Sequence, residues 1–313
     1  KEKAAVYKPP KTPWSKDFKR NWPVYVMFVP AIVYMVVLHF IPMFGIVMAF
    51  EDFNIVEGYF GSDWVGFQNF IDLFTGDQFL VALRNTICIA ILKNTIGFVP
   101  PIIFAFLLSM IENKRFKRIC QTMSYLPNFV AAVVVASLVT EFLGKDGPLT
   151  MLLTNVFGLE NQNWLANEHI PIFWIIYVLM GVWQGVGWGS IMYVAAISTV
   201  SGDLHEAAAI DGANRWQQVW HVELPAILPT IIILLIMNMG GILSVGFEKT
   251  FLMQNPLNKS VSEVISTYVY NVGLKSSQFS FGSAVGLFNT VVNFVFLVLA
   301  NQISKRAADI SLM

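Results

Sequence analysis

Few side chains in this sequence stand at spacings that support catalysis. Its four histidines are scattered along the chain: His39, His169, His205 and His221. No H-E-x-x-H metal motif, G-x-S-x-G nucleophile motif or G-x-x-x-x-G-K-[ST] phosphate loop occurs. The carboxylates Asp203, Asp211 and Glu223 are spread through one polar stretch instead of being paired. We therefore expect no catalytic site, no metal and no cofactor in this chain, and any ATP would be hydrolysed by a partner.

The polar stretch at residues 201–225 lies between two long apolar runs and is patterned as two short helices. Asp203 is predicted to cap the first helix, with Glu206 three residues later completing a capping box. Gly212 then supplies a break, because glycine adopts left-handed backbone conformations at little steric cost. Asn214 and the glutamine three residues after it give a second cap signal.

The second helix of this stretch is predicted to close at Leu224-Pro225, before the chain returns to apolar sequence. Ala207 and Ala208 are important because small side chains allow another protein surface to approach a helix backbone closely. We therefore expect residues 201–225 to be a docking element in water.

The spacing of these residues resembles the EAA loop of permease subunits of bacterial type I ABC importers. The matching positions are Glu206, Ala207, Ala208, Gly212, Val222, Leu224 and Pro225, with Asp211 beside them. Val222 is a mild departure, since this aliphatic position is often isoleucine in the family. The resemblance implies that the loop docks into a groove of a cytoplasmic ATPase and transmits its movement. A passive amphipathic surface helix is the alternative, and seven matched positions argue against it.

The composition is that of an integral membrane protein. Of 313 residues, 56% are hydrophobic and 13% are charged, unlike a soluble domain of ordinary composition. The net charge of zero gives no indication of nucleic-acid binding. The two cysteines, Cys88 and Cys120, match no metal or redox spacing.

Six apolar segments each approach or exceed the ~20 residues that cross a bilayer as a helix. They span residues 24–50, 87–111, 123–143, 171–200, 226–251 and 282–303. This pattern predicts an all-α integral membrane fold with six transmembrane helices at residues 24–303. A cytoplasmic tail and interfacial segment would precede it at 1–23, and a second cytoplasmic tail would follow at 304–313.

The basic residues indicate which ends of these helices face the cytoplasm. Fourteen Lys and Arg fall on the side that holds both tails, the loop at residues 113–118 and the stretch 201–225. Five fall on the other side. Lys93 lies within the second span, where it is expected to be structural or to snorkel. The positive-inside rule therefore predicts that both termini and residues 201–225 are cytoplasmic.

Further motifs extend the resemblance over nearly the whole chain, toward the branch of permeases for oligosaccharides and polysaccharide fragments. They are Lys19-Arg20-Asn21-Trp22, Asn113-Lys114-Arg115-Phe116-Lys117-Arg118, Ser124-Tyr125-Leu126-Pro127, Gly246-Phe247-Glu248-Lys249, Asn255-Pro256-Leu257 and Ile265-Ser266-Thr267-Tyr268-Val269-Tyr270. The resemblance implies the type I importer permease fold in a bacterial cell membrane. It also implies a heterodimer with a second, homologous permease, two ATP-binding subunits that hold ATP and magnesium, and an extracellular lipid-anchored sugar-binding protein.

Two stretches are candidates for a sugar path, because sugars are held by aromatic faces beside polar side chains. In the fourth span, Gln184, Gly185 and Trp188 belong to a segment with two indoles, three glycines and an amide. Helix–helix packing through the glycines explains this segment equally well. Trp183 and Trp188 are five residues apart, so they need not face the same way.

The second candidate stretch is Phe247, Glu248 and Lys249, toward the outer half of the predicted fifth span. Ionisable residues within spans are costly and usually face a path, a cavity or each other. The resemblance to sugar permeases also implies a cavity lining here, and an interfacial Glu248–Lys249 pair is the alternative. Asn238 and Asn289 are weaker candidates, since interhelical hydrogen bonds would explain them too.

Together these patterns predict the membrane-spanning permease subunit of an ATP-driven oligosaccharide importer that works by alternating access. Two alternatives stay open: a permease of the same architecture for a non-sugar solute, and an integral membrane enzyme acting on a lipid-linked sugar. The enzyme would need clustered carboxylates at a water interface. Purification separates these classes, because a transport subunit should co-purify with ATPases and an enzyme should turn over alone.

Overall fold

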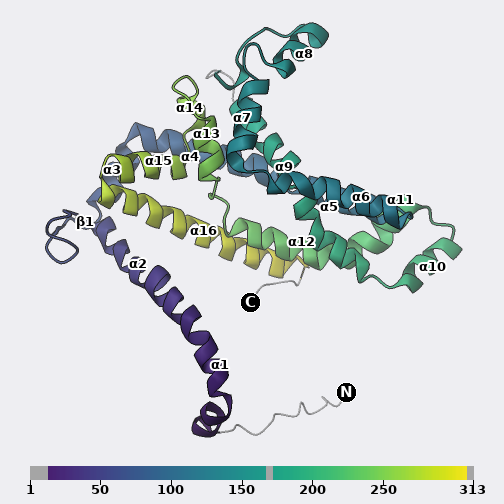
Figure 1. Ribbon diagram of the computed structural model, residues 1–313, viewed down its shortest axis with the longest axis horizontal. Helices are drawn as coiled ribbons and strands as arrows, with labels where there is room; N and C mark the ends of the chain where they lie inside the picture. Colours follow the sequence, from purple (N-terminus) through teal and green to yellow (C-terminus); the bar gives the residue numbers. More distant parts are fainter. Residues whose placement is uncertain (1–12, 167–171, 309–313) are drawn as a thin grey trace.

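The computed structural model describes residues 13–166 and 172–308 of the chain. Helices make up most of this part, and its one sheet is an antiparallel pair, β1 (Glu51–Asp52) and β2 (Asp63–Trp64). Figure 1 shows an N-terminal helical arm, labelled α1 and α2, that extends away from a body of packed helices. The predicted all-α architecture is confirmed for these residues.

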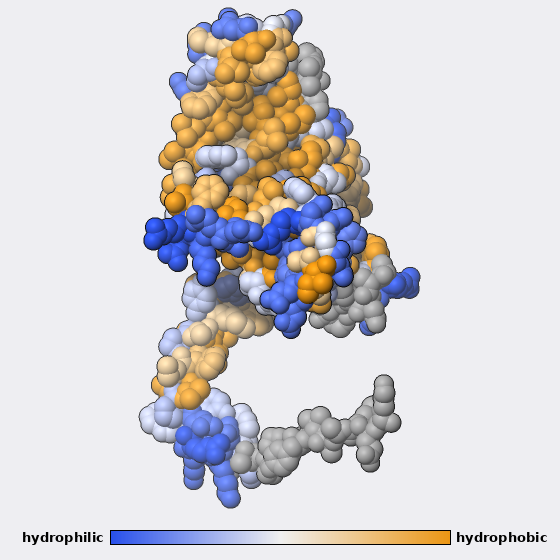
Figure 2. All heavy atoms as spheres, turned by 90° about the vertical axis from the view of Figure 1, so that its right-hand side faces the viewer, coloured by the Kyte–Doolittle hydropathy of each residue, from blue (hydrophilic) through white to orange (hydrophobic). Residues whose placement is uncertain are grey.

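Five helical segments of the described chain are long and apolar enough to cross a membrane. They are Lys16–Phe50, Asp77–Ser109, Ile172–Ser198, Arg215–Met239 and Phe279–Arg306. A sixth crossing is completed if the bent pair Lys114–Phe129 and Ala132–Phe142 counts as one span. Figure 2 shows a broad hydrophobic surface bordered by hydrophilic residues, as expected for helices that face lipid.

The N-terminal arm is one long helical segment with almost no contact to the body along its length. It consists of α1 (Trp14–Met35), a π-helical turn (Val36–Phe40), α2 (Ile41–Met43) and a 3₁₀ turn (Phe44–Phe50). Its apolar side chains are exposed, so lipid or another subunit must cover them. Only its last part is tied down: Phe44–Phe50 packs against α16 (Phe279–Ala308), and Asn69 Nδ2 donates to Ala49 O at 3.1 Å.

The second span begins earlier than the predicted residue 87. After α3 (Gln68–Thr75), α4 (Asp77–Leu92) continues through a π-helical turn (Lys93–Gly97) into α5 (Val99–Ser109), which packs on α9 (Ile172–Ser198). The polar residues that hid this start are bonded inside the protein. The Asn85 Nδ2 donates to Ser260 O at 3.0 Å and to Glu263 O at 2.9 Å.

The third predicted span, residues 123–143, is wrong as a single straight helix. The chain forms α6 (Lys114–Tyr125), a 3₁₀ turn (Leu126–Phe129) and α7 (Ala132–Phe142), with a bend of 91° between the two parts. Pro127 lies at this break, where it lacks the N–H that a continuing helix would need. Beyond α7 come α8 (Pro148–Phe157) and a 3₁₀ turn (Trp164–Ala166).

The fifth predicted span, residues 226–251, is also corrected. The helix α12 (Leu224–Met239) ends before two glycines, and Asn293 Oδ1 then accepts a hydrogen bond from Leu243 N at 3.0 Å. The remaining elements are α13 (Phe247–Met253), α14 (Lys259–Ser262), α15 (Ile265–Val269), a π-helical turn (Tyr270–Lys275) and α16 (Phe279–Ala308). Residues 247–249 therefore belong to a separate short helix and not to the fifth span.

Glycine allows one especially close contact between α6 and α9. A Cβ at Gly187 would collide with the backbone carbonyl of Ser124. Such close approach through small residues is how helices associate in membranes, where lipid removes most of the hydrophobic driving force.

We expect Gly187→Val to lower the yield of folded protein strongly, because overpacking costs about 1–3 kcal/mol or more where the neighbour is backbone. The matched control is Gly181→Val on the same helix, where an added Cβ meets no atom within 4 Å. Size-exclusion chromatography of the two variants in detergent, expressed in parallel, measures the difference. Equal yields of monodisperse protein would show that the α6–α9 contact does not depend on glycine.

Candidate functional site

The first helix of the docking stretch is α10 (Gly202–Ile210), and its cap differs from the predicted one. The Ser201 Oγ accepts from Asp203 N at 3.2 Å, so Ser201 is the N-cap and Asp203 lies in the first turn. Serine and aspartate are both favourable N-cap residues, and here the earlier of the two caps the helix. Glu206 consequently lies beyond the first turn, exposed, and forms no capping box.

The turn after α10 has the conformation that the sequence predicts. Gly212 has φ of 79°, the left-handed region that glycine enters without strain. The Ala213 N–H donates to Ala208 O at 2.9 Å, which closes the end of α10. The next helix, α11 (Arg215–Gln218), starts with the predicted capping box between Asn214 and Gln217.

The second helix of the stretch does not close at Leu224-Pro225. The segment α11, a π-helical turn (Val219–Glu223) and α12 form one continuous helix, Arg215–Met239. The predicted closure is therefore wrong. The wider π-helical turn directly before Pro225 accommodates a residue that lacks an N–H, so the helix continues through it.

A buried carboxylate anchors the docking stretch to the membrane helices. Glu223 is 6% exposed, and its Oε2 accepts a hydrogen bond from Ser109 Oγ at 2.8 Å, at the end of α5. The His205 Nε2 on α10 lies 4.0 Å from Glu223 Oε1. Arg215 pairs with Glu112 at 2.7 Å on the surface nearby. These contacts connect α10 to the end of α5 and to the helical segment Arg215–Met239.

The small side chains of α10 leave a hollow of about 480 Å³ between α10 and the first turns of the helical segment Arg215–Met239. Four residues of the matched motif line this hollow, together with the neighbouring Asp211: Ala207, Ala208, Gly212 and Val222. Leu224 and Pro225 lie in the first turn of α12 instead. The hollow is a concave polar and apolar surface suited to receive part of another protein.

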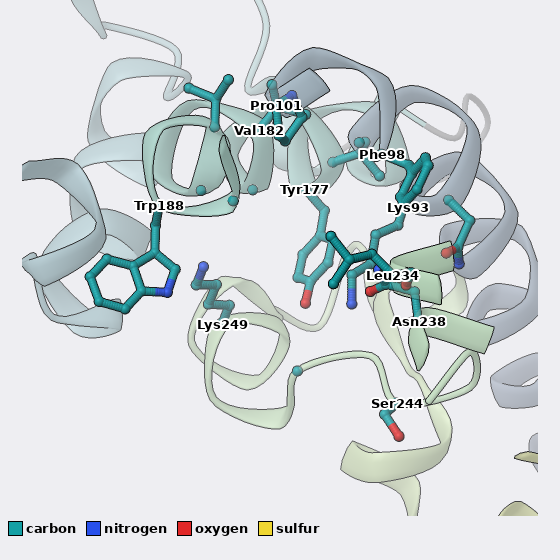
Figure 3. Close-up of a pocket in the computed structure, with 18 of the residues that line it drawn as sticks. Lys93, Phe98, Pro101, Tyr177, Val182, Trp188, Leu234, Asn238, Ser244 and Lys249 are labelled. Carbon is teal, nitrogen blue, oxygen red and sulfur yellow. Dashed lines mark hydrogen bonds between the residues drawn. The ribbon is translucent and has the colours of Figure 1, made fainter. Parts of the chain in front are cut away.

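A larger cavity of about 710 Å³ lies between the π-helical turn Lys93–Gly97 and the helices α5, α7, α9, α12 and α13, within the range of small-molecule sites. Six of the eight predicted sugar-path residues line it: Gly185, Trp188, Asn238, Phe247, Glu248 and Lys249. Figure 3 shows the Trp188 indole and the Lys249 amine on one side of this space and Asn238 on another. The fold therefore brings the fourth-span candidates and residues 247–249 together, although they lie far apart in the sequence.

Two predicted residues lie outside the cavity lining. Gln184 is 6% exposed, and its Nε2 donates to Val130 O at 2.9 Å, so it joins α9 to the bend before α7. Asn289 lies on α16, with a buried Oδ1 that has no hydrogen-bond partner within the described chain. The fourth-span segment thus has residues of both predicted kinds. Gln184 and Gly187 pack against neighbouring segments, while Gly185 and Trp188 line the cavity.

The cavity also contains residues that the sequence did not place there, among them Lys93, Asn94, Tyr177 and Tyr193. The sequence alone favours a structural or snorkelling role for Lys93. The position of Lys93 within an apolar span could have indicated that it lines a cavity, because ionisable groups inside a membrane usually face paths and cavities. The tyrosines gave no such signal, since aromatic residues are common throughout these helices.

Apolar helices long enough to cross a membrane surround a cavity lined by charged, polar and aromatic side chains, an arrangement typical of a membrane-embedded transport subunit. The described residues contain no group of three or more His, Cys, Asp or Glu placed to hold a metal ion. Residues 17–308 match the family described as "Binding-protein-dependent transport system inner membrane component", and the chain belongs to this family. The predictions of an inner-membrane transport subunit, and not an enzyme, are thereby confirmed.

Similar proteins cover almost the whole chain. Over 286 residues the chain is 42% identical to the polygalacturonan/rhamnogalacturonan transport system permease protein YteP of Bacillus subtilis (strain 168), covering 91% of this chain and 88% of that protein. Protein LplB of the same organism is 37% identical over 294 residues, covering 94% and 92%. A solved structure of a bacterial alginate ABC transporter, in complex with an alginate pentasaccharide-bound periplasmic protein, matches with a TM-score of 0.86 and 36% identity, covering 96% and 99%. The predicted importer permease fold is confirmed.

Proposed function

We propose that this chain is the permease subunit of an ATP-driven importer of oligosaccharides or polysaccharide fragments. The central cavity carries the proposal, because it sets Trp188 and Tyr177 beside the polar side chains of Asn238 and Glu248 between apolar helices. Aromatic faces with a few polar groups are what a sugar needs from a site. The named relatives, a polygalacturonan/rhamnogalacturonan permease and an alginate transporter, support the same substrate class.

The partners of this subunit would be a second homologous permease, two ATP-binding subunits and an extracellular lipid-anchored sugar-binding protein. The exposed apolar arm Lys16–Phe50 supports a second permease, since lipid or a neighbouring subunit must cover it. The solved alginate transporter was crystallised with a sugar-loaded periplasmic protein, which supports the binding-protein partner. The ATPases would hold the ATP and magnesium, and this chain would bind no cofactor.

Coupling would run through residues 201–225. When ATP closes the ATPase dimer, α10 would be carried with it, and the Glu223–Ser109 bond would pass the movement to α5. The cavity would then open toward the loaded binding protein. Glu206, Ala207 and Ala208 would form the contact with the ATPase, because they lie on the exposed or hollowed side of α10.

Both termini and the docking stretch would face the cytoplasm. The ion pair between Arg215 and Glu112 supports this orientation, because it places the docking stretch beside the basic start of α6. Basic clusters of this kind are retained on the cytoplasmic side of membranes.

The orientation predicts a labelling pattern for single cysteines introduced after Cys88 and Cys120 are replaced. A cysteine in place of Lys114 should be protected from impermeant thiol reagents in intact cells, and one in place of Asn161 should react. Both positions are exposed in the structure, so access depends on the side of the membrane. Permeabilised cells provide the control, in which both should label. The reverse pattern in intact cells would contradict the orientation and, with it, the ATPase contact.

The substrate class is tested by deleting the gene and measuring uptake. The deletion strain should lose growth on at least one oligosaccharide of a defined panel and keep growth on peptides and amino acids. Restoration by the wild-type chain is the control. Loss of peptide or amino-acid uptake alone would favour the alternative permease for a non-sugar solute.

A further inference from the structure

Two lysines face the central cavity from different parts of the fold. Lys93 lies in the π-helical turn midway along the segment Asp77–Ser109, and Lys249 lies on the short helix α13. Figure 3 shows both side chains reaching into the space where the Tyr177 hydroxyl ends. Helix α13 approaches this hydroxyl closely, since a Cβ at Gly246 would lie 3.2 Å from it.

Neither lysine has a counter-ion among the described residues. The ion pairs within 4.0 Å in that part of the chain involve other groups: His205 with Glu223, Arg215 with Glu112, and Lys259 with Glu263. Glu248 is the one carboxylate in the cavity lining, against the two ammonium groups. The cavity lining therefore carries a formal excess of one positive charge.

Lys93 lies within a segment long enough to span the membrane, where an unpaired cation is unfavourable unless it meets water or an anion. A purely structural lysine would be expected to pair with a carboxylate or a backbone carbonyl, as Lys259 does with Glu263. The cavity instead keeps both ammonium groups free beside aromatic and amide side chains. The ligand that fits this arrangement is a sugar that itself brings negative charge.

We propose that the cavity selects acidic oligosaccharides, built from uronates, whose carboxylates pair with Lys93 and Lys249. The sugar hydroxyls would donate to Glu248 and Asn238, and Trp188 would cover a ring face. This inference rests on the proposed sugar import and narrows its substrate class.

The test compares uptake of an oligogalacturonate with uptake of the same oligosaccharide after its carboxyl groups are reduced to alcohols. The complete complex with its binding protein is used in proteoliposomes. All variants share one binding protein, so its own preference cancels between them. Lys93→Met and Lys249→Met are compared with Lys145→Met, which removes an exposed lysine in the loop before α8.

In each cavity variant the ratio of acidic to neutral uptake should fall about ten-fold or more, the size of one lost charge-assisted hydrogen bond. Lys93→Arg should restore much of that ratio, and Lys145→Met should keep it at the wild-type value. A structural role would lower both uptakes equally and leave the ratio unchanged, which would overturn the proposal. Efficient neutral uptake with no acidic uptake by the wild type would overturn it as well. Failure to import either form, when the deletion strain has lost growth on another oligosaccharide of the panel, would overturn this proposal alone. Failure to import either form together with normal growth of the deletion strain on the whole panel would refute the sugar-import function itself.

Discussion

Cells that carry Gly212→Val or Glu206→Lys should lose sugar uptake almost completely, while their binding protein captures sugar normally. Gly212 has a φ of 79°, where a β-branched residue is strained by about 1–2 kcal/mol, and the strain would displace α10 from its docking position. Glu206 is exposed on α10, so a lysine there reverses the charge presented to the ATPase without disturbing the core.

Gly212→Asn is the matched control for the turn, because asparagine tolerates the left-handed region far better than valine. An added Cβ at residue 212 meets no atom within 4 Å, so backbone conformation alone separates the two variants. The asparagine variant should keep most of the uptake. If residues 201–225 were a passive surface helix, an exposed charge swap would change stability by only a few tenths of a kcal/mol. Normal uptake in Glu206→Lys would support that alternative.

Removing the Trp188 indole should weaken transport of the native sugar about ten-fold or more, with complex assembly intact. Trp188 lines the cavity, and its ring packs edge-on against Phe129 with the ring centroids 5.7 Å apart. This contact holds the indole in place for a ligand. Trp183→Ala is the control, since that indole is 53% exposed and lies outside the cavity lining. Glu248→Ala should act like Trp188→Ala, because a lost hydrogen bond to a charged group weakens binding about ten- to a hundred-fold.

Concentration-dependent uptake separates these variants, with the amount of assembled complex measured in the same membranes. Equal transport by the Trp183 and Trp188 variants would show that the cavity indole packs the helix and does not contact sugar.

The features that the sequence predicted well are local ones. The left-handed turn at Gly212 and the capping box of Asn214 with Gln217 depend on a few consecutive residues, and both are confirmed. Asp203 failed as a cap because Ser201, two residues earlier, serves equally well in isolation. The choice between them depends on where the helix α9 ends, which no local pattern specifies.

The bends in the third and fifth spans could not be predicted from apolar composition. A straight helix and two shorter ones bury the same residue types, and prolines occur within other spans that stay continuous. The end of α12 depends on Asn293, which accepts from Leu243 N fifty residues away in the sequence. That contact is visible only once α16 has packed.

The cavity was predicted in part for a similar reason. The chemical types of residues 247–249 and Trp188 predict a sugar site, and the fold brings these residues to one cavity. Gln184 and Gly185 are adjacent, yet one is buried against Val130 and the other lines the cavity, because neighbouring helical residues point about 100° apart. Sequence type identifies candidates, and helix packing decides which of them face the ligand.

The most direct test is ATP hydrolysis by the complete complex in proteoliposomes, with and without sugar-loaded binding protein. The wild-type complex should hydrolyse ATP faster when the loaded binding protein is added, and Gly212→Val should show no such increase while Gly212→Asn does. This result would connect the outer sugar signal to the ATPases through residues 201–225. An increase of wild-type size in Gly212→Val and in Glu206→Lys would contradict the coupling role of that segment.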